Sequence, residues 1–476
     1  MGRDQKEAKM KELLALAIIG GAVTTLPADW NQFRGPAGGG VANGTASLPV
    51  DIGPDSPHLV WKSPIPKGHS TPIVHGDRIF LTGLDKKKLR TFAVSRLDGK
   101  IEWSAEAPYE KLESVHRIGS HATPSVATDG EVVISMFGSN GLFCYDVDGK
   151  QLWHRPMGPF NNSFGAASSP LLVDDRIVMV QDHDTGSFLA IYDKTTGDEV
   201  WKAERSNSRR NYSTPCIWTV NGKRQIVVAG SAHVVAYAFE SGDVVWTVRG
   251  ISRVVNTTPV VGDDNRLYVA CTGGSETEQP VFAEVLKGAD ANSNGTLEPD
   301  ELPKSPIKSF FTQFDRDVDG SLDEEEYNSI REIFSLSETV AMAIRSGGTG
   351  DITTSHVDWK ESKSIPRNSS PLYYKGLLFL VADGGIATSI NAETGEMLQR
   401  GRLSATGKYY SSPAVGDGKL YIIGERGHLT VVSAEARWKQ LAESSFEEDV
   451  YASPAISDGC VFVRTVSNLF CFRLSE

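Results

Sequence analysis

The sequence predicts an all-β fold, an eight-bladed β-propeller of four-stranded blades, on three observations. A Ser or Thr followed by Pro recurs eight times, and six of the seven intervals between these prolines are 41 to 52 residues long. Most repeats end in a strand that closes with Trp. The repeats contain short β-branched runs without helical periodicity, which is typical of propeller blades. The hydroxyl residues of the eight pairs are Thr71, Thr123, Ser169, Thr214, Thr258, Ser370, Ser412 and Ser453.

The repeat from Arg210 to Trp246 shows the internal order of one unit. A hydroxyl-Pro opening leads to two apolar strands, and a turn at Ser241-Gly242-Asp243 precedes the strand that closes with Trp246. An acidic residue next to a Gly between two apolar runs predicts a hairpin turn between strands. The closing positions of other units are assigned to Trp103, Trp153, Trp201, Trp359, Trp438 and, as a departure from Trp, Gln399.

The first and last strands predict how the ring closes. The final repeat has only about three strands and lacks a Trp strand, whereas His58-Leu59-Val60-Trp61-Lys62 has the expected pattern near the other end of the chain. An N-terminal strand that completes the last blade would close the ring without leaving an open edge.

The fifth proline interval is 112 residues long and predicts an α-helical insert in the fifth blade, at 274–340. Two twelve-residue segments in it, 290–301 and 315–326, match the EF-hand calcium loop completely. Calcium prefers six to eight oxygen ligands, and Gly295 and Gly320 allow the chain to turn around the ion. The predicted ligands of two calcium ions are Asp290, Asn292, Asn294, Thr296, Glu298, Glu301, Asp315, Asp317, Asp319, Ser321, Asp323 and Glu326.

The charges and the spacing of the two loops predict which loop binds calcium more tightly and how the loops pair. The second loop has five acidic ligand positions against three in the first, so we expect it to bind calcium more tightly. Leu297 and Leu322 occupy the same loop position, where two calcium loops can pair as a short ladder. The segment contains sixteen acidic and five basic residues, so it carries most of the chain's net charge of −12. The alternative is a solvated acidic loop that binds no ion.

The propeller topology predicts which residues share a face with the insert. The connections that enter the innermost strands lie on the same face as the loops between second and third strands. We therefore expect the residues three positions before each proline to surround the channel mouth: His69, His121, Ala167, Tyr212, Asn256, Asn368, Tyr410 and Tyr451. Basic neighbours include Arg117, Arg209, Arg210, Arg253, Arg367 and Lys408. This pattern predicts a site for a small polar or anionic ligand, and the alternative is a set of turn residues that bind only water.

The N-terminal region predicts export. Leu13 to Val23 is an apolar run of eleven residues that follows Lys9 and Lys11, and it is too short to span a bilayer. We assign 1–28 to a signal peptide, with Met10 as an alternative start, and expect a periplasmic or extracellular protein without a transmembrane span. The alternative is an N-terminal helix. The predicted propeller then occupies 29–273 and 341–476, on either side of the insert.

Cysteine usage and net charge exclude some classes of function. The five cysteines show no CxxC pair and lie in apolar strand contexts, although Cys460 and Cys471 flank one hairpin and could pair in an oxidising compartment. The negative net charge argues against a nucleic-acid-binding protein, which would normally present a basic face.

The repeat resembles the pyrroloquinoline-quinone-like propeller repeat. The resemblance lies in a Gly and a charged residue that are followed, after two further positions, by Trp, as in Gly99-Lys100-Ile101-Glu102-Trp103. Quinoprotein dehydrogenases and the outer-membrane assembly factor BamB share this repeat. The segment Asp29-Trp30-Asn31-Gln32-Phe33-Arg34-Gly35-Pro36 also resembles the start of mature exported members of the family. The resemblance implies a propeller fold, whereas one fold can host unrelated functions.

The same resemblance separates three functional hypotheses. Catalytic members hold the quinone between a Trp and a vicinal disulfide, with a calcium ion in the propeller centre, but this sequence has no adjacent cysteines. We therefore predict a non-enzymatic binding or scaffold protein for an envelope protein or small ligand, without bound pyrroloquinoline quinone. The alternatives are a quinone-dependent dehydrogenase of alcohols or sugars and a BamB-like outer-membrane assembly partner. Proteins of the BamB type are lipid-anchored and lack calcium loops.

Overall fold

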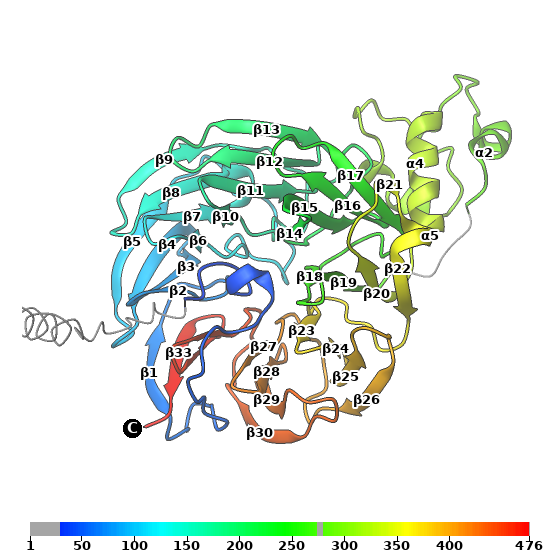
Figure 1. The fold of residues 1–476 in the computed structure, drawn as a ribbon. Helices are drawn as coiled ribbons and strands as arrows, with labels where there is room; N and C mark the ends of the chain where they lie inside the picture. The colour runs from blue at the N-terminus through cyan, green and yellow to red at the C-terminus, as the bar shows by residue number, and fades with distance from the viewer. Residues whose placement is uncertain (1–28, 274–278, 476) are drawn as a thin grey trace, which may run out of the picture.

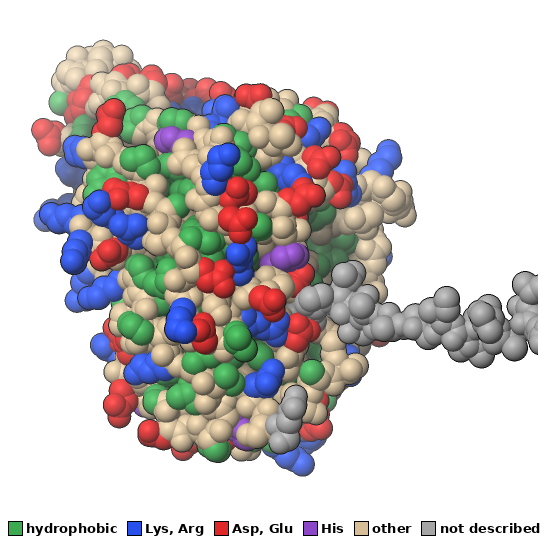
Figure 2. Space-filling view, turned by 90° about the vertical axis from the view of Figure 1, so that its left-hand side faces the viewer, with side chains coloured by type: hydrophobic (Ala, Val, Ile, Leu, Met, Phe, Trp, Pro, Cys, Tyr) green, Lys and Arg blue, Asp and Glu red, His purple; other side chains and the backbone are tan. Residues whose placement is uncertain are grey.

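The computed structural model describes residues 29–273 and 279–475, which form eight antiparallel sheets arranged in a ring (Figure 1). The predicted eight-bladed propeller is therefore confirmed. The predicted signal peptide lies outside the described residues. Apolar side chains from neighbouring sheets pack face to face, so the core lies between the blades. On the outer wall, acidic and basic side chains alternate with small apolar spots (Figure 2).

The first four blades follow in chain order. Blade 1 contains β2 (Ile73–His75), β3 (Arg78–Asp85), β4 (Lys88–Ser95) and β5 (Ile101–Ala107). Blade 2 contains β6 (Ala127–Thr128), β7 (Val132–Met136), β8 (Leu142–Asp146) and β9 (Gln151–Arg155). Blade 3 contains β10 (Leu171–Val173), β11 (Arg176–Gln181), β12 (Phe188–Asp193) and β13 (Glu199–Glu204). Blade 4 contains β14 (Cys216–Val220), β15 (Lys223–Gly230), β16 (His233–Ala238), β17 (Val244–Arg249) and the parallel addition β21 (Gly350–Asp351).

The last four blades complete the ring. Blade 5 contains β18 (Val260–Val261), β19 (Arg266–Cys271), β20 (Val340–Arg345) and β22 (Val357–Glu361). Blade 6 contains β23 (Leu372–Tyr374), β24 (Leu377–Ala382), β25 (Ile386–Asn391) and β26 (Met397–Arg402). Blade 7 contains β27 (Ala414–Gly416), β28 (Lys419–Ile423), β29 (His428–Ser433) and β30 (Gln440–Ser445). Blade 8 contains β31 (Ala455–Ser457), β32 (Cys460–Arg464), β33 (Asn468–Arg473) and β1 (Leu59–Pro64).

Helices are short and lie between strands. The segment between β19 and β20 contains α2 (Phe282–Ala289), α3 (Pro306–Ser309), η3 (Phe311–Gln313) and α4 (Glu324–Ser335). The remaining helices in the described part of the chain are η1 (Pro36–Gly38), η2 (Gly138–Asn140) and α5 (Thr353–His356). Among the described residues, every helix is too short or too polar to cross a bilayer.

The N-terminal strand closes the ring, as predicted. β1 pairs antiparallel with β33, and Trp61 lies opposite Cys471. The last blade thus joins the two ends of the propeller without a covalent link. Cys460 and Cys471 lie on adjacent strands as buried free thiols, and contacts with Cys471 and Arg96 lower the pKa of Cys460 to about 6.

In five of the eight blades, the Trp residue of the outermost strand ties its blade to the next, whereas Trp246 of blade 4 donates to Gln225 of the same blade. In these five blades, the indole N–H donates to a backbone carbonyl of the following blade at 2.9–3.0 Å, from Trp61, Trp103, Trp153, Trp201 and Trp359. The glycine of the acidic turn lies under the ring of the preceding blade. A Cβ on Gly149 would be 2.5 Å from Trp103 Cδ2, and its φ of +88° also favours glycine.

Two assignments of this closing position need revision. Gln399 lacks the indole, yet its side-chain amide donates to the Trp438 carbonyl of the next blade at 3.0 Å, so it forms the same type of link. The assignment of Trp438 is wrong, because Ala442 pairs with Val431 at the position that Trp occupies in other blades. Trp438 lies before β30 and packs where Gly401 leaves room for its ring.

The segment that precedes β1 crosses the end of the channel opposite the connections that enter the innermost strands. Its contacts reach several blades: Trp30 bridges Val74, the Asn31 carbonyl accepts from Thr128, Arg34 Nη2 donates to the Pro371 carbonyl, and Val41 bridges Val415. Figure 1 shows η1 of this segment near the centre of the ring. The segment therefore gives the central channel a floor.

Candidate ligand-binding cavity and calcium loops

A belt of hydroxyl groups joins the innermost strands where they begin. Each innermost strand is preceded by one Ser or Thr, here called the belt residue. At seven of the junctions between blades, the hydroxyl of the belt residue accepts a hydrogen bond from the backbone N–H of the belt residue in the preceding blade, at 2.9–3.3 Å. The eight belt residues are Thr71, Ser125, Ser169, Thr214, Thr258, Ser370, Ser412 and Ser453. The recurrent Ser or Thr of the sequence therefore has a structural role in holding the ring together.

Blade 2 departs from the predicted spacing by two residues. Its belt residue is Ser125, because every innermost strand begins two residues after its belt hydroxyl and β6 begins at Ala127. Thr123 therefore takes the mouth position, whereas His121 turns away and its Nε2 lies 2.8 Å from the Glu113 carbonyl oxygen. The sequence pattern predicts Thr123 as the belt residue because Pro124 follows it. The prediction is wrong, since the belt residue Ser125 is followed by Val126 and not by proline.

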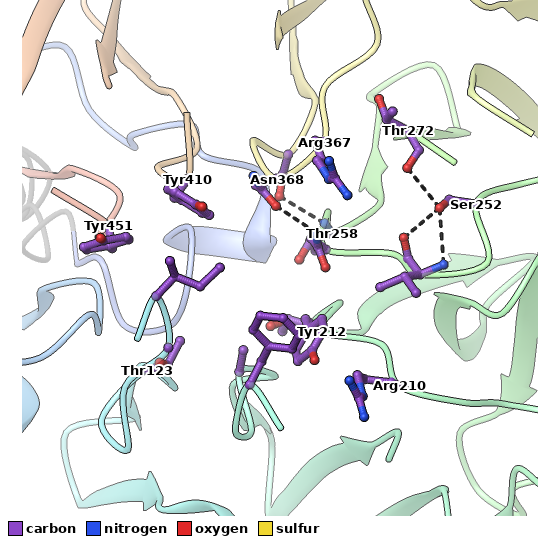
Figure 3. Close-up of a pocket in the computed structure, with 18 of the residues that line it drawn as sticks. Thr123, Arg210, Tyr212, Ser252, Thr258, Thr272, Arg367, Asn368, Tyr410 and Tyr451 are labelled. Carbon is purple, nitrogen blue, oxygen red and sulfur yellow. Dashed lines mark hydrogen bonds between the residues drawn. The ribbon is translucent and has the colours of Figure 1, made fainter. Parts of the chain in front are cut away.

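The mouth residues line one cavity of about 810 Å³ in the centre of the ring (Figure 3). The structure brings together eight equivalent residues, here called the mouth ring: His69, Thr123, Ala167, Tyr212, Asn256, Asn368, Tyr410 and Tyr451. Phe33 of the N-terminal segment contributes to the floor. Three side chains of the insert, Phe310, Phe314 and Ile333, also line the cavity, and we call them the roof.

Aromatic and amide contacts order one part of the mouth ring. His69 stacks on Tyr451 with centroids 4.0 Å apart, and Tyr410 lies next to Tyr451 at 5.2 Å. Asn256 donates to Asn368 at 2.7 Å. Burial, with a smaller effect of the Arg464 charge, lowers the pKa of His69 to about 3, so its imidazole is neutral at neutral pH.

Basic side chains concentrate on the same cavity. Arg209, Arg210, Arg253, Arg367 and Lys408 line it, against one carboxylate, that of the exposed Asp383. Arg210 is paired, since its Nε donates to Asp184 Oδ1 at 2.8 Å. Within the described part of the chain, the side chains of Arg253, Arg367 and Lys408 form no ion pair with a carboxylate. The cavity therefore has an excess of positive charge.

Arg209 is the most buried of these cations, with 5% of its surface exposed. Its Nη1 donates to the Ser208 carbonyl at 3.0 Å, but its Nε and Nη2 have no hydrogen-bond partner among the described residues. Burial, together with repulsion from Arg316, lowers its pKa to about 10, which still leaves the guanidinium charged at neutral pH.

The insert packs directly onto these arginines. The Arg209 guanidinium lies 5.7 Å from the ring centroid of Phe314, and that of Arg253 lies 4.6 Å from Phe310 and 4.8 Å from Phe334. The backbone N–H of Arg253 also donates to Ser337 Oγ at 3.1 Å. Cation–π contacts of this kind hold the insert over the mouth.

The second predicted calcium loop gathers carboxylates. Oxygen atoms of Asp315, Asp317 and Glu326 lie within 4.8 Å of one another. Asp315 is 7% exposed, and its Oδ1 has no hydrogen-bond partner in the described part of the chain. Burial raises the pKa of Asp315 and of Glu326, with repulsion from neighbouring carboxylates as a smaller cause. Such a cluster favours a cation, and carboxylate oxygens are the ligands that calcium prefers.

The other predicted ligands of this loop follow the turn around the cluster. Asp319 Oδ1 accepts from the Ser321 N–H at 2.8 Å, and Gly320 has a φ of +88° with open space around it. Asp323 caps α4, because its carboxylate accepts from the Glu326 N–H at 2.7 Å and Glu326 accepts from the Asp323 N–H in return. Asp319, Ser321 and Asp323 therefore stabilise the turn and the start of α4 through hydrogen bonds of their own.

The first loop has the same turn but a looser set of carboxylates. Asp290 Oδ2 accepts from the Gly295 N–H at 3.1 Å, and Glu301 Oε1 accepts from the Ala291 N–H at 2.8 Å. Glu298 Oε1 accepts from the Asn294 amide at 2.6 Å, and the Thr296 N–H donates to Asn294 Oδ1 at 2.9 Å.

The two loops pair with each other. Leu297 and Leu322 form an antiparallel bridge with N–O distances of 3.1 and 2.9 Å, as their shared loop position predicts. Both leucines are buried in the insert's own apolar core. The bridge couples the geometry of the first loop to that of the second.

Comparison with known proteins identifies the class of propeller. A family model described as outer membrane protein assembly factor BamB matches residues 50–209, 186–283 and 350–476. Because these segments cover well over half of the sequence, the chain belongs to the BamB family of pyrroloquinoline-quinone-like propellers. Residues 284–349, which contain both loops, lie outside the matched segments.

Individual relatives are distant. An outer membrane protein assembly factor BamB from Burkholderia pseudomallei (strain K96243) is 25% identical over 248 residues, which are 50% of this chain and 58% of that protein. The chain therefore spans a little over half the length of this curated relative. BamB from Moraxella catarrhalis superposes with a TM-score of 0.54 at 13% identity, covering 87% of this chain and 99% of that structure. The computationally designed Ika8 protein gives 0.53 at 9% identity, covering 86% and 98%. These structural similarities concern the fold alone.

Proposed function

We propose that this protein is an exported, calcium-binding member of the BamB family that acts as a non-catalytic scaffold in outer-membrane assembly. The family match favours this BamB-like alternative over the more general binding role expected from the sequence. The family match along the propeller carries this proposal, because the family and its relatives are described as outer-membrane assembly factors. The proposed layout is a signal peptide at 1–28, a propeller at 29–273 and 341–476, and an EF-hand pair at 274–340.

Calcium binding by the insert is the second part of the proposal. Support comes from the cluster formed by the carboxylates of Asp315, Asp317 and Glu326, in which the buried Oδ1 of Asp315 has no hydrogen-bond partner among the described residues. The bridge between the two loops supports it as well. Each predicted ligand set would hold one ion. Because the helices of the insert contact Arg209 and Arg253, ions in the loops would stabilise the insert on the mouth face.

The partner is expected to dock on the mouth face, where part of the insert projects beyond the edge of the ring (Figure 1). Val318, at the tip of the second loop, is 73% exposed, whereas Leu97, in the turn between β4 and β5, is 85% exposed on the opposite face. These two residues give a matched pair of probe positions of similar chemistry.

Photo-crosslinking in living cells tests this proposal. A photoreactive amino acid at Val318 is expected to capture an envelope protein, identified by mass spectrometry, whereas the same probe at Leu97 captures none. Addition of a calcium chelator to permeabilised cells is expected to reduce the Val318 product. Equal products from both positions, or capture of cytoplasmic proteins alone, would argue against an envelope scaffold that works through its mouth face.

A further inference from the structure

We infer that the part of the cavity beneath the insert binds a small organic anion, whose carboxylate or phosphate group contacts Arg209, Arg253 and Arg367 and whose apolar part contacts the roof. This inference rests on the proposed role as a binding protein and names the class of ligand that it would hold. Three independent features of the cavity support it.

The first feature is the unpaired charge of Arg209. Burying a guanidinium without partners is costly, and each unmade hydrogen bond adds to this cost. Arg34 and Arg464 are also buried with nitrogens that have no partner among the described residues, but neither lines the cavity. Arg205 is satisfied within the fold by Asp182 and Tyr237. Arg209 instead leaves Nε and Nη2 unpartnered next to an open cavity. An anion is the group that would complete its hydrogen bonds.

The second feature is the clustering of like charges. Arg253 has a lowered pKa because of burial and of repulsion from Arg367. Arg253 and Arg367 both line the cavity, and an anion in that space would relieve the repulsion between them. The chain as a whole has a net charge of −12, and the side of the molecule seen in Figure 2 mixes both signs. The positive charge that lines the cavity therefore favours anions there.

The third feature is the combination of size and apolar surface. A volume of about 810 Å³ lies in the range of small-molecule sites and is much larger than a lone inorganic anion needs. Phe310, Phe314 and Ile333 present apolar surface above the arginines. Phe310 also contacts the Arg253 guanidinium, which orients its planar donors. An anion with an apolar or aromatic body fits this arrangement better than phosphate alone.

Titration calorimetry on the full mature chain with calcium present tests the inference. The probes are 2-naphthoate, the neutral analogue 2-naphthalenemethanol, and acetate, which carries the charge without the apolar body. We expect naphthoate to bind with 1:1 stoichiometry and at least about 10-fold more tightly than either of the others, since only naphthoate combines charge-assisted hydrogen bonds with an apolar body.

Variants locate the binding site. The double variant Arg253→Gln/Arg367→Gln is expected to lower naphthoate affinity at least about 10-fold. Arg400→Gln, on the exposed outer strand β26, is the matched control and should leave affinity unchanged. Melting curves check that each variant is folded. Equal binding of naphthoate and naphthalenemethanol, an unaffected double variant, or no binding at millimolar naphthoate would overturn the inference. Loss of the Val318 crosslink alone would instead count against the envelope scaffold.

Discussion

Replacing Glu326 with Gln is expected to weaken calcium binding at the second loop by roughly 10- to 100-fold, as removal of a charged bidentate ligand should. Glu326 is 4% exposed, and its carboxylate lies in the cluster with Asp315 and Asp317. The amide that replaces it cannot neutralise the ion. Calorimetric titration of the chain with calcium should then show the loss or weakening of the tighter of the two sites that we predict for the unmodified protein.

The control for this experiment is Glu324→Gln. Glu324 lies in the same first turn of α4, but it is exposed and outside the carboxylate cluster. It removes the same charge from the helix N-terminus without removing a ligand, so calcium affinity should change little. A comparable loss in both variants would show that general negative charge, and not coordination, attracts the ion.

Asp182→Ala is expected to lower the free energy of unfolding by about 3–5 kcal/mol, the usual cost of breaking a buried ion pair. Asp182 accepts from Arg205 Nε at 2.8 Å and from Nη2 at 3.0 Å, and their side chains are 2% and 1% exposed. The Tyr237 hydroxyl also contacts this guanidinium at 2.6 Å. Without Asp182, the Arg205 charge remains buried and uncompensated in the wall between blades 3 and 4. Urea unfolding measures the change.

Asp174→Asn provides the comparison for this variant, because Asn tolerates the φ of +53° at this position whereas Ala would be strained there. Asp174 also pairs with an arginine, Arg224, but its side chain is 73% exposed, and solvent screens the interaction. We expect a change below about 1 kcal/mol for this surface pair. Similar losses in the two variants would contradict the assignment of Asp182 and Arg205 as a buried structural pair.

The repeat pattern predicted most of the architecture because each blade has to solve the same packing problem. A Trp that donates to the next blade needs a glycine beneath its ring, so the sequence records both partners, as with Trp103 and Gly149. The closing strand was recognisable for the same reason, since Trp61 forms the same link as its equivalents. These interactions are local to one interface and repeat around the ring.

Departures from the pattern were harder to predict because tertiary contacts decide them. Ser125 takes the belt position without a following proline. The repeat pattern therefore places blade 2 two residues too early and predicts His121, and not Thr123, as its mouth residue. Trp438 was misassigned because Gly401 accommodates its ring from outside the strand. The unpartnered nitrogens of Arg209 could not be foreseen either, because the insert buries them and its position over the mouth depends on packing.

The central claim is that calcium orders the insert and thereby holds the roof over a cationic cavity. Hydrogen exchange of the full chain, with calcium and with a chelator, tests it most directly. The account predicts that calcium increases protection in 282–335 and in the underlying segment 207–212, while the strands of blades 1, 2 and 7 exchange equally in both states. Identical protection of 310–335 in the two conditions would contradict the claim.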